Sequence, residues 1–210
     1  MIFKITPRLN QIIKASAIIL LLMLIVNSII AIGNVNTALG IALIFYIVKC
    51  MLAVLLLLYI ISTLVYFGEK KYIVIAFIIY TAVDVIGRVD AIVETQMHSY
   101  SNEVSSIIGL TTFLVTIYLF IASLPVRSKV IFPACLLFTI SLFAMAILKM
   151  AVTLILPYLG PLEFRSVQGF YRMRTVIDYI ETLSVLIPIA FFILANRVNR
   201  YLESQQIATS

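Results

Sequence analysis

Six long apolar runs constrain the fold of this chain more than any other feature. Each is long enough to cross a hydrocarbon core of roughly 30 Å, which takes about 20 helical residues. The runs lie near residues 15–33, 38–66, 72–94, 104–125, 130–157 and 174–196. The sequence therefore predicts an all-α polytopic membrane protein, in which residues 1–210 form a single domain of six transmembrane helices.

Composition supports a membrane protein. The chain is 63% hydrophobic and 11% charged, whereas a soluble domain has roughly 45–50% apolar and 25% charged residues. Lys4, Arg8 and Lys14 precede the first run, as the basic residues of a signal peptide do. That run is longer than the 7–15 apolar residues of a signal peptide, so we expect an uncleaved first helix.

The basic residues between the runs predict the orientation of the chain. Nine of them fall in the N-terminal arm, the turns near 67–72 and 125–130, and the C-terminal tail: Lys4, Arg8, Lys14, Lys70, Lys71, Arg127, Lys129, Arg197 and Arg200. Only Glu69 and Glu203 oppose them there. By the positive-inside rule, both termini are expected in the cytoplasm and the protein in the plasma membrane. The net charge of +6 is then explained by topology, and it gives no support for a nucleic-acid partner.

One predicted helix carries an unusual number of charges. Asp84, Arg88, Asp90 and Glu94 fall on one face of the segment 80–94, while aliphatic residues fill the opposite face. A charge at the centre of a bilayer costs roughly 2.5–3.5 kcal/mol on insertion scales, so these residues need partners or water. Asp84 and Arg88 are four residues apart and can form an ion pair along the helix.

Complementary charges on other predicted helices lie at similar depth. With the predicted topology, all of them fall at or outside the middle of the membrane: Lys49, Lys149, Arg174, Asp178 and Glu181. Charges spread over four helices are most simply satisfied if they converge on one polar cavity. We therefore predict a ligand site in the outer half, formed by Asp84, Arg88, Asp90, Glu94, Lys49, Lys149, Arg174, Asp178 and Glu181.

Two further segments carry expectations. Ser105, Gly109, Thr112, Thr116 and Ser123 follow one face of the fourth helix, which predicts a packing seam between helices. The outer connection 158–173 has amphipathic spacing, which is typical of a segment that lies flat on the membrane surface or covers a cavity.

Several functions fit this pattern. The favoured one is the binding of a small polar or ionic ligand for transport or sensing. The alternatives are an enzyme acting on a lipid head group at the outer surface, and a non-catalytic subunit whose charges hold helices together. Beyond the lipid bilayer, a partner membrane protein or a second copy of the chain is a further candidate partner.

Sharper chemical hypotheses have less support. Glu94 and His98 have the spacing of two metal ligands, Asp178 and Glu181 could bind magnesium with a lipid phosphate, and Asp84 could relay protons. A third metal ligand with suitable spacing does not follow from the sequence, and no catalytic or nucleotide-binding motif is present. We therefore predict no metal or cofactor and leave catalysis open.

Overall fold

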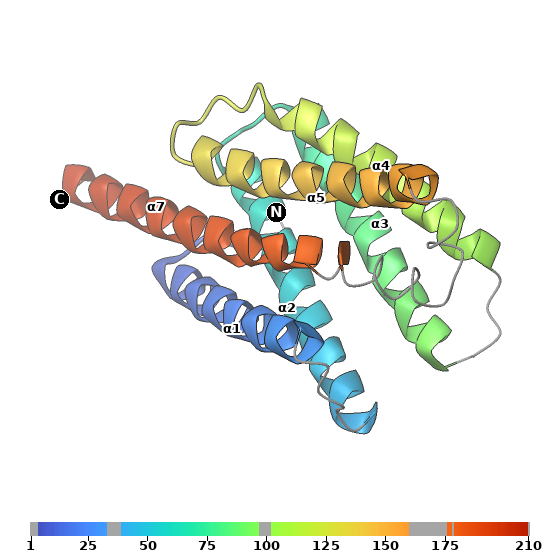
Figure 1. The fold of residues 1–210 in the computed structure, drawn as a ribbon. Helices are drawn as coiled ribbons and strands as arrows, with labels where there is room; N and C mark the ends of the chain where they lie inside the picture. Colours follow the sequence, from blue (N-terminus) through green and yellow to red (C-terminus); the bar gives the residue numbers. More distant parts are fainter. Residues whose placement is uncertain (1–3, 33–38, 97–101, 160–175, 178, 210) are drawn as a thin grey trace.

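The computed structural model describes residues 4–32, 39–96, 102–159, 176–177 and 179–209. This part of the chain is helical and contains no strand (Figure 1). Its elements are α1 (Pro7–Ile32), α2 (Leu39–Tyr66), α3 (Lys71–Gln96), α4 (Asn102–Ser123), α5 (Phe132–Leu159), the 3-10 helix η1 (Thr182–Val185) and α7 (Leu186–Thr209). The all-α prediction is confirmed.

Five helical stretches are long and apolar enough to cross a membrane, counted over the described residues. They are Pro7–Ile30, Leu43–Tyr66, Lys71–Ile92, Phe132–Val152 and Tyr179–Ile207. The apolar part of α4, Ile107–Ser123, is shorter. The chain is thus a multi-pass membrane protein by the length and composition of its helices, and the sixth crossing stays a prediction.

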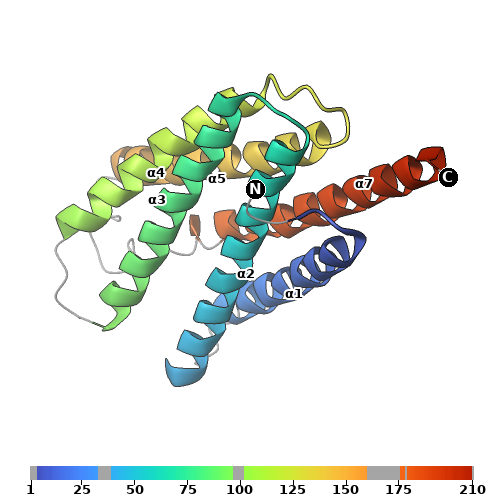
Figure 2. The same cartoon turned by 180° about the vertical axis from the view of Figure 1, so that it is seen from behind.

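The helices form a closed ring in chain order. Each of α1 to α4 packs against the helix that follows it, α5 packs against α7, and α7 packs against α1. The two views show α1 beside α7 and α3 beside α4 (Figures 1 and 2). Short turns explain the antiparallel pairs, because few residues separate α2 from α3 and α4 from α5. The ring encloses the space in which charged side chains can meet.

The first and last helices extend beyond their apolar runs. Predicted bounds of 15–33 and 174–196 become Pro7–Ile32 for α1 and Leu186–Thr209 for α7. Helices α1 and α7 pack against each other, and the added turns contain the buried core residues Ile13 and Val198. Tertiary contact stabilises these polar helix ends, which hydropathy alone would assign to the loops.

Two turns and the two chain ends meet at one end of the bundle. The side chain of Arg197 in α7 donates to the carbonyl of Lys129 in the α4–α5 turn, and the rings of Phe67 and Tyr201 lie 5.1 Å apart. We call the half of the ring at this end the terminal half, and the other the distal half. Both halves contain buried residues, but they differ in what fills the centre of the ring.

Aromatic side chains fill the centre of the ring at mid-length. Phe138 of α5 packs against Phe77 and Tyr80 of α3 and Phe191 of α7, with ring centroids 5.3–6.1 Å apart. Phe77, Phe138 and Phe191 are buried completely or nearly so. This aromatic cluster, consisting of these four residues, closes the middle of the bundle with apolar material.

The predicted polar seam of α4 is present in part. Thr116 and Ser123 are buried, and the Ser123 hydroxyl lies 2.9 Å from that of Thr139 in α5, so these helices share a hydrogen bond. Gly109 is exposed, with open space where a side chain would begin, so it lies outside the seam. The side chain of Ser105 lies outside the described residues.

Candidate functional site

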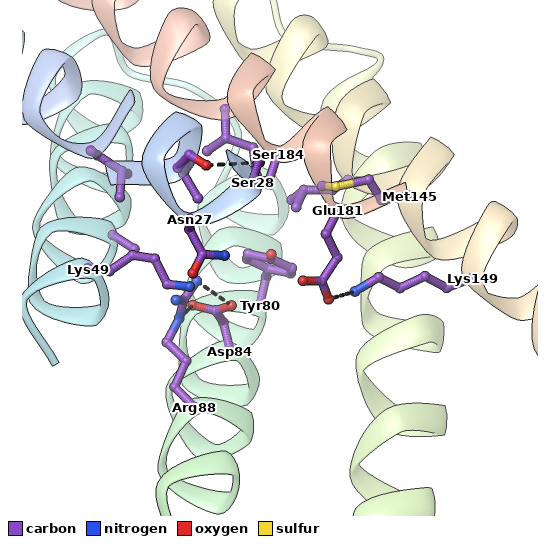
Figure 3. A pocket seen from close by; sticks show the side chains of 15 residues that line it. Asn27, Ser28, Lys49, Tyr80, Asp84, Arg88, Met145, Lys149, Glu181 and Ser184 are labelled. Atoms are coloured by element: carbon purple, nitrogen blue, oxygen red, sulfur yellow. Dashed lines mark hydrogen bonds and ion pairs between the residues drawn. The ribbon is translucent and has the colours of Figure 1, made fainter. Parts of the chain in front are cut away.

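A polar cavity of about 280 Å³ opens in the distal half, next to the aromatic cluster. Its walls come from α1, α2, α3, α5, η1 with the preceding Glu181, and the start of α7, while α4 contributes none of the lining residues. Figure 3 shows the side chains that line it: Leu20, Leu24, Asn27, Ser28, Lys49, Ala53, Tyr80, Asp84, Arg88, Leu142, Met145, Lys149, Glu181, Ser184 and Ile187. Five of the nine predicted site residues are therefore brought to one cavity: Lys49, Asp84, Arg88, Lys149 and Glu181.

Asp84 and Arg88 form the first ion pair of the cavity. The Nε and Nη2 atoms of Arg88 donate to the two carboxylate oxygens of Asp84 over 2.6 and 3.1 Å. The pair is bidentate, and the helical spacing of four residues sets it up within α3. This confirms the ion pair expected from the sequence. The remaining terminal nitrogen of Arg88, Nη1, lies 3.8 Å from the sulfur of Cys50 on α2.

Lys149 and Glu181 form the second ion pair, on the other side of the cavity in Figure 3. Lys149 Nζ lies 2.7 Å from Glu181 Oε1, which links α5 to the start of η1. Glu181 makes no side-chain capping bond to η1, so its carboxylate is available to Lys149. This pair joins two residues that are 32 positions apart in the sequence.

The helix interruption beside Glu181 has a local cause. Pro188 lacks an amide hydrogen and clashes with the carbonyl four residues earlier, so an α-helix cannot run undisturbed through this point. The structure has the 3-10 helix η1 immediately before α7, in which Pro188 occupies the first turn. Proline is well tolerated there. The interruption places Glu181 and Ser184 on the cavity wall.

Lys49 differs from the other cations of the cavity. Its ammonium lies 5.0 Å from the ring centre of Tyr46, one turn earlier on α2, which is within cation–π distance. Its side chain points toward the Asp84–Arg88 pair in Figure 3. Among the residues that the structure describes, no carboxylate forms an ion pair with Lys49. The nearby carboxylate of Asp84 pairs with Arg88.

The other four predicted residues are not brought to this cavity by the described structure. Asp90 is half-buried on α3, outside the set of lining residues. Glu94 belongs to α3, but its side chain lies outside the described residues, and so do Arg174 and Asp178. Most of the predicted surface segment, residues 160–173, also lies outside them.

Sequence reasoning missed four polar lining residues: Asn27 and Ser28 of α1, Tyr80 of α3 and Ser184 of η1. A signal existed for the first two, because an adjacent asparagine and serine interrupt an otherwise apolar run. Their uncharged side chains were overlooked beside the charged ones. In the described part of the chain, no three His, Cys, Asp or Glu side chains gather as they would to hold a metal ion.

The site can hold a small polar molecule. Its volume of about 280 Å³ lies near the lower end of the range of ligand pockets, roughly 300–1,000 Å³. Its hydrogen-bond donors include charged lysine and arginine side chains and neutral amide and hydroxyl groups. Its two carboxylates already form ion pairs with cations of the wall. No protein-family model, curated protein or solved structure matches this chain.

Proposed function

We propose that this protein spans the plasma membrane six times with both termini in the cytoplasm, and that its cavity binds a small polar or ionic ligand for transport or sensing. The single observation that carries the proposal is the convergence of Lys49, Asp84, Arg88, Lys149 and Glu181 on one cavity in the distal half. With the predicted orientation, that half is the outer one, and the ligand enters from outside.

Energetics favour a site over incidental packing. Charged groups within a membrane are costly, and they mark ligand or ion pathways when they face a common interior. Small residues would pack the same helices at lower cost. The cavity also ends at the aromatic cluster, which separates it from the terminal half by buried apolar rings. A pocket bounded by apolar rings toward the terminal half suits binding from the distal side.

Access from outside can be measured with a single cysteine. In a chain with Cys50→Ala and Cys135→Ala, we expect Ser184→Cys to react with a membrane-impermeant maleimide applied to intact cells, because Ser184 lines the cavity. Ser141→Cys is the matched control, since Ser141 is 2% exposed on α5 and bonds to its own helix. We expect this control to stay unlabelled under native conditions. If Ser184→Cys stays as unlabelled as this control in intact cells, the cavity is closed to the outside and the proposal is overturned.

The Lys149–Glu181 ion pair favours a second candidate, a non-catalytic membrane subunit in which charges link helices. Lys149 and Glu181 connect α5 to η1, as such a role requires. This candidate predicts that Ser184→Cys stays unlabelled while Glu181→Gln impairs assembly of the folded protein. The ligand-site proposal predicts labelling at Ser184→Cys and a folded Glu181→Gln variant. Measuring both on the same preparations separates the two candidates.

A further inference from the structure

The charges that line the cavity do not cancel. Three cations, Lys49, Arg88 and Lys149, face two carboxylates, Asp84 and Glu181. Each carboxylate is held in an ion pair with one of the cations. Lys49 is the cation that remains, so the described lining has a formal excess of one positive charge. The excess positive charge of the described lining therefore favours an anion over a cation in this cavity.

Lys49 is the charged group of the cavity whose desolvation is not offset by an ion pair in the described structure. It belongs to α2, a helix that is apolar enough to cross a membrane, and it is half-buried on the wall of the cavity. Its contact with Tyr46 offsets only part of the desolvation of an ammonium, since a cation–π contact contributes about 0.5–2 kcal/mol. A bound anion would offset more, because two opposite charges attract strongly where water is limited. The ion pair that Lys49 lacks within the described chain is one that a ligand can supply.

Neighbouring donors could complete an anion site beside Lys49. Arg88 has five N–H donors; two serve Asp84 and one points to Cys50, which leaves further hydrogens on its terminal nitrogens. Asn27 lies close to Lys49 and Arg88 in Figure 3, and its amide can donate as well. Oxyanions are recognised by such combinations of a lysine, an arginine edge and neutral donors.

We infer that the cavity is selective for anions, and that Lys49, with Arg88 and Asn27 beside it, binds a small carboxylate or phosphate-type oxyanion. This inference rests on the proposed function, because it needs the cavity to be open to a ligand. The two ion pairs keep the remaining charges of the wall neutral. The cavity volume of about 280 Å³ limits the bound group to a small molecule or to the charged part of a larger one.

Two thiol reagents of similar size and opposite charge test the selectivity. The reagents are the anionic sulfonatoethyl and the cationic trimethylammonioethyl methanethiosulfonates, applied to Ser184→Cys in the same cysteine-free chain. We compare their rates after dividing each by its rate with a free thiol in solution. We expect the anionic reagent to be favoured, and Lys49→Gln to lower that preference roughly tenfold, as the loss of one nearby charge in a poorly hydrated site would. Lys14→Gln, which removes a half-buried lysine of α1 outside the cavity, is the matched control and should leave the preference unchanged.

The outcomes separate this inference from the function on which it rests. If neither reagent reacts, the cavity is closed and the proposed function fails. If both react without a preference for the anion, or if Lys49→Gln leaves the preference intact, the cavity is open but the anion site is wrong. Thermal unfolding of each variant in detergent shows whether that variant is folded. If Lys49→Gln does not fold, Lys49→Met takes its place in the comparison.

Protection experiments identify the source of the anion. Sodium phosphate and sodium acetate are compared with sodium chloride at constant ionic strength, in nanodiscs of phosphatidylcholine. A free oxyanion would slow the labelling of Ser184→Cys, and less so with Lys49→Gln. A lipid phosphate would instead slow labelling in nanodiscs that contain phosphatidylglycerol, without added phosphate. If neither addition slows labelling through Lys49, the oxyanion inference is overturned.

Discussion

The two ion pairs of the cavity differ in their exposure to solvent, and this difference should set their contributions to stability. The side chains of Arg88 and Asp84 are 27% and 15% exposed, whereas those of Lys149 and Glu181 are 41% and 52% exposed. Breaking a buried pair costs about 3–5 kcal/mol, because a charge is left behind. An exposed pair contributes only about 0–1 kcal/mol.

We therefore expect Asp84→Asn to lower the free energy of unfolding by an amount near the lower end of the buried range, and Glu181→Gln to change it little. Unfolding in mixed detergent micelles measures both. Combining Asp84→Asn with Arg88→Gln should recover much of the loss, since neither charge then remains unpaired. Equal losses for the two single variants would show that exposure does not govern these pairs.

The same residues show which contacts a sequence can predict. The pair Asp84 and Arg88 follows from a spacing of four on one helix, so the sequence was sufficient. The pair Lys149 and Glu181 joins residues 32 positions apart, and only the packing of α5 against the region of η1 brings them together. Arg88 holds both oxygens of Asp84, and this carboxylate forms no ion pair with Lys49.

At the scale of elements, Glu69 connects two turns of the terminal half. Its carboxylate accepts from the backbone amides of Arg127 and Ser128, over 2.8–3.1 Å, and so ties the α2–α3 turn to the α4–α5 turn. Gly68 precedes it with a φ of 66°, a left-handed conformation that suits glycine at the end of α2. In the sequence, Glu69 is noticed only as one of two acidic residues in the segments that are predicted to be cytoplasmic.

Removing this carboxylate should destabilise the bundle. Glu69 is 8% exposed, and a hydrogen bond to a charged group contributes about 1.5–3 kcal/mol, so we expect Glu69→Ala to cost an amount in that range. Glu69→Gln keeps one acceptor oxygen and should cost less. Glu203→Ala is the control, because Glu203 is exposed and bonds to Asn199 within α7. Thermal unfolding in detergent checks the order, and a loss from Glu203→Ala as large as from Glu69→Ala would contradict it.

For the whole molecule, hydropathy predicted the all-α architecture and the approximate positions of five helices that are long and apolar enough to cross a membrane, because an apolar run in lipid must form a helix. It could not predict the ring order or the closure of α1 on α7, which depend on side-chain packing. Nor could it place the cavity against the aromatic cluster. Phe77, Phe138 and Phe191 are ordinary apolar residues in the sequence and become a barrier only when three helices meet.

The distribution of charge predicts the orientation of the ring in the membrane, and this prediction can be tested directly. The structure places both turns rich in basic residues, near Lys70 and Lys129, at the same end as the C-terminal part of α7. Nine basic residues and only two acidic ones belong to this end and the adjoining arms, and such segments are retained in the cytoplasm. In the cysteine-free chain, we expect Lys70→Cys and Lys129→Cys to react with an impermeant maleimide only after permeabilisation of the cells.

Glu163→Cys provides the comparison from the other predicted side. It should react in intact cells, because the predicted topology starts in the cytoplasm and places five crossings before the connection at 163. Labelling of Lys70→Cys and Glu163→Cys from the same side would refute the six-span topology. It would also contradict the prediction that the cavity faces outward, since Lys49 and Glu181 lie in the half opposite to Lys70.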